Sequence, residues 1–143
     1  MVYRLFIVCC WIGFTCSAWA QEAFLEAHPI DIELDLCLEA DSNFTTNAMI
    51  SCLNTAYMAW DNDLNEHYQL IMDQLSTELQ DHLRNSQRSW MAYRDREVEF
   101  MMEMYGSFQG TMWKLSIMDR KLEITRKRAL ELHDYLDVLT FQR

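Results

Sequence analysis

The sequence predicts an all-α fold: an antiparallel bundle of three helices, preceded by an extended N-terminal arm that one disulfide ties to the bundle. Three observations carry this prediction. From Thr45 onward, apolar residues recur every three or four positions, which is the spacing of one face of a helix. Little interrupts this pattern, because residues 21–143 contain one proline and two glycines. The same residues contain two cysteines, Cys37 and Cys52, and the total length suits one domain.

Residues 1–20 are predicted to be a signal peptide. Arg4 precedes the apolar run LFIVCCWIGFTC, and Ala18 and Ala20 occupy the small-residue positions of a cleavage site. A membrane anchor is the less favoured alternative, because the apolar run is shorter than the ~20 residues that cross a bilayer. We therefore expect cleavage near Ala20, a mature chain that begins at Gln21, and a periplasmic or secreted protein without stable membrane insertion.

Residues 21–44 show a different pattern from the rest of the chain. Within IDIELDLCLE, apolar residues alternate with acidic residues and a cysteine, which is the period of a β-strand. No second strand is visible for it to pair with, so we expect an extended arm or, alternatively, a short helix. In an oxidising compartment an even pair of cysteines indicates a disulfide, so Cys37 and Cys52 are expected to tie this arm to the first helix. Two buried thiols are the alternative.

The helical bundle is expected within residues 45–139, where three apolar stripes follow one another. The third stripe alternates spacings of three and four throughout, which is typical of a bundle seam. The stripes are, in chain order, Met49, Leu53, Tyr57, Trp60, Leu64, Tyr68, Ile71 and Leu75; Leu79, Leu83, Ser86, Trp90, Tyr93, Glu97, Met101 and Met104; and Leu115, Met118, Leu122, Thr125, Ala129, Leu132, Leu136 and Leu139.

Capping residues predict where the helices begin and end. The second helix is expected to start after Ser76 or Thr77, because Thr77 and Gln80 fit a capping box. Gly106 is placed to end that helix in a left-handed conformation. Thr111 is a good N-cap for the third helix.

The sequence gives little support for catalysis, and we expect neither enzyme activity nor a cofactor. No G-x-S-x-G motif and no phosphate-binding loop occur. The four histidines, His28, His67, His82 and His133, are far apart and show no metal-ligand spacing such as H-E-x-x-H. Distance along the chain does not prevent histidines from meeting in a bundle, so a metal site remains the open alternative.

The charge of the chain excludes some partners. Its formal net charge is −10 at pH 7, and loss of Arg4 with the signal peptide makes the mature chain more negative still. Such a charge argues against nucleic acids and against anionic membrane surfaces. It suits a cationic protein partner, or it serves solubility alone.

The segment 87–100 holds the densest group of polar and aromatic residues. Trp90, Tyr93 and Glu97 lie on the stripe of the second helix, with Arg94 at its edge. A carboxylate in such a stripe needs a partner, and Arg94 is within helical reach of Glu97. We interpret these four side chains as structural, a charge pair and aromatic anchors between helices; the alternative is a functional acid at Glu97.

Several segments resemble the family of LprI-type lysozyme inhibitors. The specific part is the L-N-x-x-Y step (Leu64, Asn65, Tyr68) followed by Q-R-x-W-x-x-Y-R-D at 87–95, and the similarity extends over about residues 34–132. The supporting segments are LDLCLEA, MISCLNTAY, WDNDLNEHYQLIMDQL, LRNSQRSWMAYRD and ITRKRALEL. Tyr68, which belongs to this motif, is also expected to be a structural residue.

The resemblance implies a small exported helical domain and, for at least some members, inhibition of lysozyme. The expected partner is then a cationic lysozyme-like muramidase, bound through an acidic helical surface that occludes the active-site cleft. The alternative is a periplasmic accessory or structural module without inhibitory activity. The family pattern usually has two further cysteines, where this chain has Val98 and, approximately, Arg120; their joint loss leaves Cys37 with Cys52.

The segment YGSFQGT joins the second and third expected helices. Gly106 and Gly110 can be explained as turn residues, with Phe108 folded back onto the end of the bundle. The sharper hypothesis makes Ser107, Phe108 and Gln109 a projecting, uncharged tip that enters the partner. Because two carboxylates act in the cleft of a glycoside hydrolase, an uncharged tip would not be repelled there. These three residues are the candidate partner-binding residues.

Overall fold

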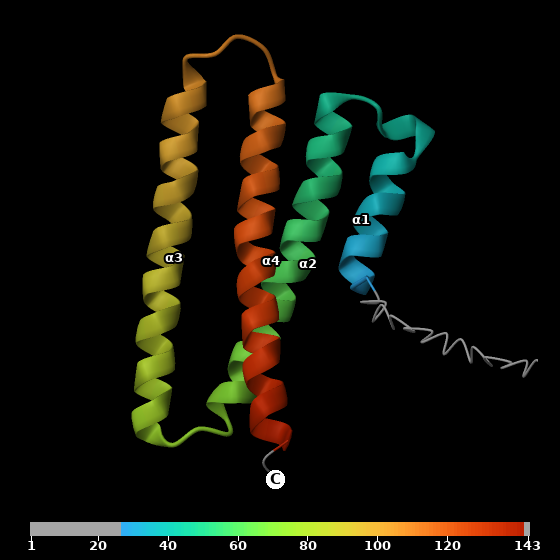
Figure 1. Ribbon diagram of the computed structural model, residues 1–143. Helices are drawn as coiled ribbons and strands as arrows, with labels where there is room; N and C mark the ends of the chain where they lie inside the picture. The colour runs from blue at the N-terminus through green and yellow to red at the C-terminus, as the bar shows by residue number, and fades with distance from the viewer. Residues whose placement is uncertain (1–26, 142–143) are drawn as a thin grey trace, which may run out of the picture.

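The computed structural model describes residues 27–141, which form α-helices, one short 3₁₀ turn and, within that range, no strand (Figure 1). The elements are α1 (Pro29–Glu39), η1 (Asp41–Asn43), α2 (Thr46–Met72), α3 (Thr77–Gly106) and α4 (Met112–Phe141). The all-α class is therefore confirmed for this part of the chain. The predicted signal peptide and the predicted start at Gln21 lie outside the described residues. Between residues 27 and 141 no helix is long and apolar enough to cross a membrane.

Within residues 27–141 the fold has four helices, because IDIELDLCLE is helical. The alternative of a short helix is therefore confirmed, and the extended arm is wrong. Ile30 and Leu34 pack against the core, and Cys37 lies on the same face, so the spacing of the inward residues is four and three. Ile32 and Leu36 are 44% and 64% exposed. The strand-like alternation was misleading because apolar residues also occupy the solvent-facing side of this helix.

Residues at its first turn explain why α1 forms. Pro29 begins the helix, a position where its missing N–H costs nothing. The Nδ1 atom of His28 accepts a hydrogen bond from the backbone N–H of Ile30 at 3.3 Å and so caps the N-terminus. Asp31 adds a favourable negative charge in the first turn.

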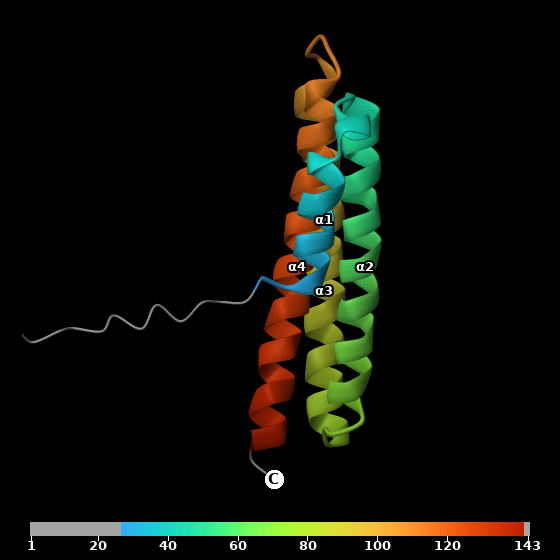
Figure 2. The same cartoon turned by 90° about the vertical axis from the view of Figure 1, so that its right-hand side faces the viewer.

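The hydrophobic core lies between α2 and α4, whose mutual contact is the most extensive in the fold. These two helices run in the same direction, although they are separated in the chain by α3, which runs in the opposite direction (Figures 1 and 2). Trp60, Ala129 and Leu132 are 0% exposed. The buried core consists of Leu53, Ala56, Trp60, Leu64, Ile71, Leu122, Ala129 and Leu132. Most of these residues belong to the predicted first and third stripes.

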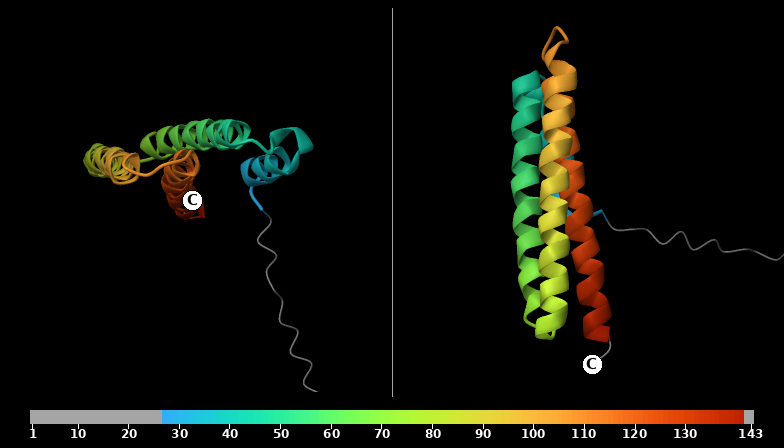
Figure 3. Two further views of the ribbon diagram at one scale, coloured as in Figure 1. Left: turned by 90° about the horizontal axis from the view of Figure 1, so that it is seen from above. Right: turned by 90° about the vertical axis from the view of Figure 1, so that its left-hand side faces the viewer.

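Helix α3 is held more loosely than α2 and α4. Of its 30 residues, Gln87 and Met101 alone are buried. The view from above shows α3 beside α4 at one side of the molecule, away from α1 (Figure 3). The predicted stripe of α3 is only partly inside: Trp90 packs against the core, whereas Leu79 and Tyr93 are 51% and 49% exposed.

The turn between α2 and α3 is closed differently from the predicted capping box. Ser76 precedes the first residue of α3 without capping it through its side chain. The side-chain amide of Gln80 instead donates to the carbonyl oxygens of Met72 at 2.8 Å and Leu75 at 3.2 Å. Gln80 therefore satisfies carbonyl groups at the end of α2, which would otherwise lack donors.

Candidate functional site

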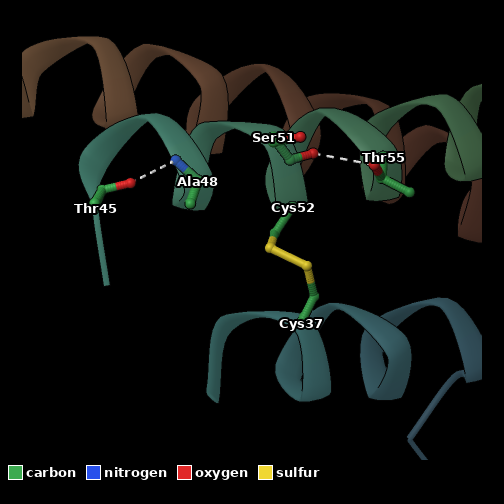
Figure 4. The surroundings of a disulfide bond; sticks show 6 residues. All are labelled: Cys37, Thr45, Ala48, Ser51, Cys52 and Thr55. Carbon is green, nitrogen blue, oxygen red and sulfur yellow. Dashed lines mark hydrogen bonds between the residues drawn. A yellow bond between two sulfur atoms is a disulfide. The ribbon is translucent and has the colours of Figure 1, made fainter. Parts of the chain in front are cut away.

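A disulfide joins Cys37 of α1 to Cys52 of α2, as predicted (Figure 4). Their Cα atoms are 5.8 Å apart, and Cys52 is buried. The bridge meets α2 near its N-terminus, where the hydroxyl oxygen of Thr45 accepts a hydrogen bond from the N–H of Ala48 at 3.2 Å. The disulfide thus fastens α1 to a capped helix end.

A second link between α1 and the bundle is a charged cluster centred on Asp31. Arg126 of α4 donates from Nε to Oδ1 and Oδ2 of Asp31 at 3.0 and 2.9 Å, and from Nη2 to Oδ2 at 2.7 Å. The indole N–H of Trp60 donates to the same carboxylate at 3.2 Å. The ring of His28 lies against the indole, with centroids 4.2 Å apart. One carboxylate therefore connects α1, α2 and α4.

The hydrogen bonds to Asp31 raise the pKa of Arg126 above its ordinary value, against the opposing effect of burial. The pKa of Arg126 is higher in the folded state than in the unfolded state. The stabilisation through Arg126 is therefore fully present below the unfolded-state pKa, and it is lost as the pH rises through the folded-state pKa. The guanidinium therefore keeps its charge throughout the range in which proteins work.

Replacing Asp31 with alanine is expected to lower the free energy of unfolding by about 2–3 kcal/mol, because the substitution removes charge-assisted hydrogen bonds and leaves the buried indole N–H without its acceptor. Urea unfolding followed by tryptophan fluorescence measures this loss. Asp35→Ala, at an exposed acid of the same helix, is the matched control. Equal losses in the two variants would assign the effect to the charge of α1 and contradict the role of the cluster.

Arg128 of α4, which is 6% exposed, makes polar contacts with α3. Its Nε donates to Oε1 of Gln87 at 3.0 Å, its Nη2 donates to the hydroxyl of Ser86 at 3.3 Å, and its Nη1 donates to Glu131 at 2.9 Å. Gln87 opens the Q-R-x-W segment, yet sequence reasoning did not single it out. Its side-chain oxygen provides a buried acceptor for a buried guanidinium, and an apolar side chain in its place would leave that guanidinium N–H without a partner.

Arg94 and Glu97, which were expected to pair with each other, have different partners. Arg94 lies over the ring of Trp90 at 5.1 Å, and its nitrogens are 3.7 Å from Asp61 of α2 and 3.0 Å from Asp95. Arg94 therefore pairs with an acid of α2 and with a neighbouring acid of its own helix.

Glu97 reaches toward α4, where its Oε1 lies 3.4 Å from Nη2 of Arg120. Arg120 stands approximately where the family pattern has a cysteine. In this chain an ion pair connects α3 to α4 at that place. Tyr68 packs half-buried against the core, whereas Tyr93 is half-exposed beside Arg120 in a shallow groove between α3 and α4. Of the residues expected to be structural, Tyr93 is the most exposed.

The segment that connects α3 to α4 forms one end of the molecule and projects beyond the end of α2 (Figures 1 and 2). Gly106 is the last residue of α3 and is not left-handed, which corrects the expected cap. Ser107 follows with φ −81°. The left-handed residue is Gly110, with φ +101°, a value that side chains with a Cβ rarely adopt. Gly110 therefore makes the turn into α4.

Phe108 combines the two alternatives considered for this loop. Its ring packs against the ring of Tyr105, with centroids 5.7 Å apart, and its backbone N–H donates to the carbonyl oxygen of Tyr105 at 2.9 Å. The side chain is nevertheless 57% exposed. Ser107 donates to the carbonyl oxygen of Met104 at 3.2 Å, and Gln109 is exposed. We call Ser107, Phe108 and Gln109 the tip.

The tip is uncharged, whereas α3 just before it carries acids. Residues 104–113 contain no charged side chain. A shallow groove beside the C-terminal part of α3 is lined by Asp95, Glu99, Glu103, Val98, Met102 and, from α4, Lys121. This acidic groove and the tip lie on consecutive parts of the chain, so a partner could contact both.

The chain resembles known proteins in two comparisons. The model of the family described as lysozyme inhibitor LprI matches residues 37–132. A solved crystal structure of an uncharacterized protein from Burkholderia thailandensis is 29% identical, with a TM-score of 0.74 over 80% of this chain. The match spans 56% of that longer chain. No curated protein matched at a significant level.

Proposed function

Because the chain belongs to the LprI lysozyme inhibitor family, we propose that it is an exported protein that binds a lysozyme-like peptidoglycan hydrolase and occludes its active-site cleft. The observation that supports this mechanism is the uncharged, projecting tip at the end of an acidic molecule. The family match supports a lysozyme-like target, and the tip suggests which part of the chain enters it.

The acidic surface suits an encounter with a cationic enzyme. Opposite net charges accelerate association and favour one relative orientation, more than they raise the final affinity. The groove with Asp95, Glu99 and Glu103 would attract lysine and arginine side chains that surround a muramidase cleft. Higher ionic strength screens such attraction, so we propose an association rate that falls steeply with added salt.

To occlude the cleft, a segment of the inhibitor must enter it without electrostatic repulsion. A glycoside hydrolase positions two carboxyl groups around the scissile bond, which would repel the acids of α3. The tip presents a hydroxyl, an aromatic ring and an amide without charge. Phe108 can fill an apolar subsite, while Ser107 and Gln109 can form hydrogen bonds at its rim.

Phe108→Ala is expected to weaken inhibition at least about tenfold, which corresponds to about 1.4 kcal/mol of binding energy, because exposed aromatic anchors dominate many interfaces. The free energy of unfolding should change by less than about 0.5 kcal/mol, as is usual for surface substitutions. The measurement is the rate at which lysozyme hydrolyses bacterial cell walls with increasing amounts of each variant.

The matched control for Phe108 is Phe100, because both rings are exposed to the same extent, 57% and 58%, and Phe100 lies on the body of α3. Phe100→Ala should inhibit as the parent chain does. Full inhibition by Phe108→Ala would contradict the role of the tip. If the parent chain inhibits none of several muramidase types, the alternative of a periplasmic accessory module becomes the better account.

A further inference from the structure

Two histidines that are far apart in the chain meet where α2 packs on α4. The ring centroids of His67 and His133 are 5.0 Å apart, with an angle of 55° between the ring planes. His133 follows Leu132, which is 0% exposed, and His67 is one turn from buried Leu64. Both rings therefore lie beside the most extensive helix contact in the fold. No sequence spacing indicates this pair, because the packing of two helices creates it.

The oxygen atoms beside each Nδ1 determine which nitrogen of the ring is available. The Nδ1 atom of His67 is 2.8 Å from the carbonyl oxygen of Asp63 and 3.4 Å from its carboxylate. The Nδ1 atom of His133 is 3.5 Å from the carboxylate of Asp137. The carbonyl oxygen of Asp63 accepts a hydrogen bond from Nδ1 of His67, so in the neutral ring Nδ1 carries the proton and Nε2 carries the lone pair. The carboxylate beside Nδ1 of His133 favours the same tautomer there.

The surroundings of His67 match those common among histidines that bind metals. A metal-binding imidazole commonly donates its other N–H to a carbonyl or carboxylate oxygen, which orients the ring and makes it a better ligand. Asp63 and Asp137 also place negative charge beside the pair, which favours a bound cation. The side chains of His67 and His133 are 15% and 51% exposed, so solvent and ions can reach them.

We propose that His67 and His133 form a site for one divalent transition-metal cation, Cu²⁺ or Zn²⁺, bound through both Nε2 atoms. In residues 27–141 no group of three or more histidine, cysteine, aspartate or glutamate side chains is placed to hold a metal ion. The protein therefore supplies two ligands and water supplies the others. Imidazole prefers Cu²⁺ and Zn²⁺, in that order of affinity, whereas Mg²⁺ prefers oxygen ligands.

The site is tested by titrating the exported chain, purified without a histidine tag, with Cu²⁺, Zn²⁺ and Mg²⁺ in a calorimeter near neutral pH. We expect one equivalent of Cu²⁺ to bind, Zn²⁺ to bind more weakly and Mg²⁺ not to bind. His67→Ala and His133→Ala should each lower the association constant for Cu²⁺ at least tenfold. His82→Ala, which removes an exposed histidine of α3, should leave it unchanged.

A second measurement uses the unaltered chain and so does not depend on the folding of a variant. Substoichiometric Cu²⁺ is paramagnetic and should broaden the imidazole NMR signals of His67 and His133 before those of His28 and His82. Joint broadening of the pair supports the site. Uniform broadening of all four histidines, absence of binding, or a Cu²⁺ affinity that survives the loss of either partner would overturn it.

Discussion

Replacing Trp60 with alanine is expected to lower the free energy of unfolding by about 3–5 kcal/mol, which is the usual loss for a large aromatic residue removed from a core. Trp60 is 0% exposed and lies in the middle of the cluster between α2 and α4. Its ring also contacts His28 and donates to Asp31. The substitution would therefore create a cavity and at the same time remove a hydrogen-bond partner of the carboxylate that holds α1.

Denaturation in urea, monitored by circular dichroism at 222 nm, measures the loss. Small domains are stable by about 5–15 kcal/mol, so Trp60→Ala should bring much of the population close to unfolding at physiological temperature. Met58→Ala is the control, because Met58 is 57% exposed on the same helix. A loss below about 1 kcal/mol for Trp60→Ala would mean that the core repacks around the cavity.

The second large effect is expected from removing the disulfide, by Cys37→Ala together with Cys52→Ala. The bridged cysteines are 15 positions apart, and closing a loop of that length contributes about 3 kcal/mol in the chain-entropy model. Asp31 would still hold α1 to Arg126, so the loss should concentrate in α1.

Hydrogen exchange locates this effect, while urea unfolding with and without reductant measures its size. Amides of α1 should exchange markedly faster in the double variant, whereas those of α4 keep their relative protection. The parent chain in reductant should behave as the double variant does. An unchanged unfolding midpoint in both would contradict a stabilising role for the disulfide.

Helical spacing was sufficient to predict α2, α3 and α4, because each has a long apolar stripe and few breaks. The seam of α4 was the clearest signal, and Leu122, Ala129 and Leu132 of that seam are buried. The same reasoning failed for α1, where exposed Ile32 and Leu36 imitate the alternation of a strand. A short segment with apolar residues on both sides gives no periodicity that separates the two structures.

Candidate sites were predictable only where they are local in sequence. The tip is one continuous segment, so its glycines and lack of charge could be read directly, although the left-handed residue proved to be Gly110 and not Gly106. The partners of Asp31, Gln87 and His67 are 95, 41 and 66 positions away along the chain. Such contacts follow from how the helices pack, which a single sequence does not specify.

The parallel contact between α2 and α4 has a consequence for how the protein folds. Helices that are adjacent in the chain can form their contacts early, because only a short loop has to close. Here the main partner of α2 is the last helix, and all of α3 lies between them. Bundles with such non-local contacts fold more slowly than simple hairpins of helices. During synthesis the N-terminus emerges first, so the core cannot form until residues 112–141 have been made. Until then Leu53, Trp60 and Leu64 remain without their packing partners in α4.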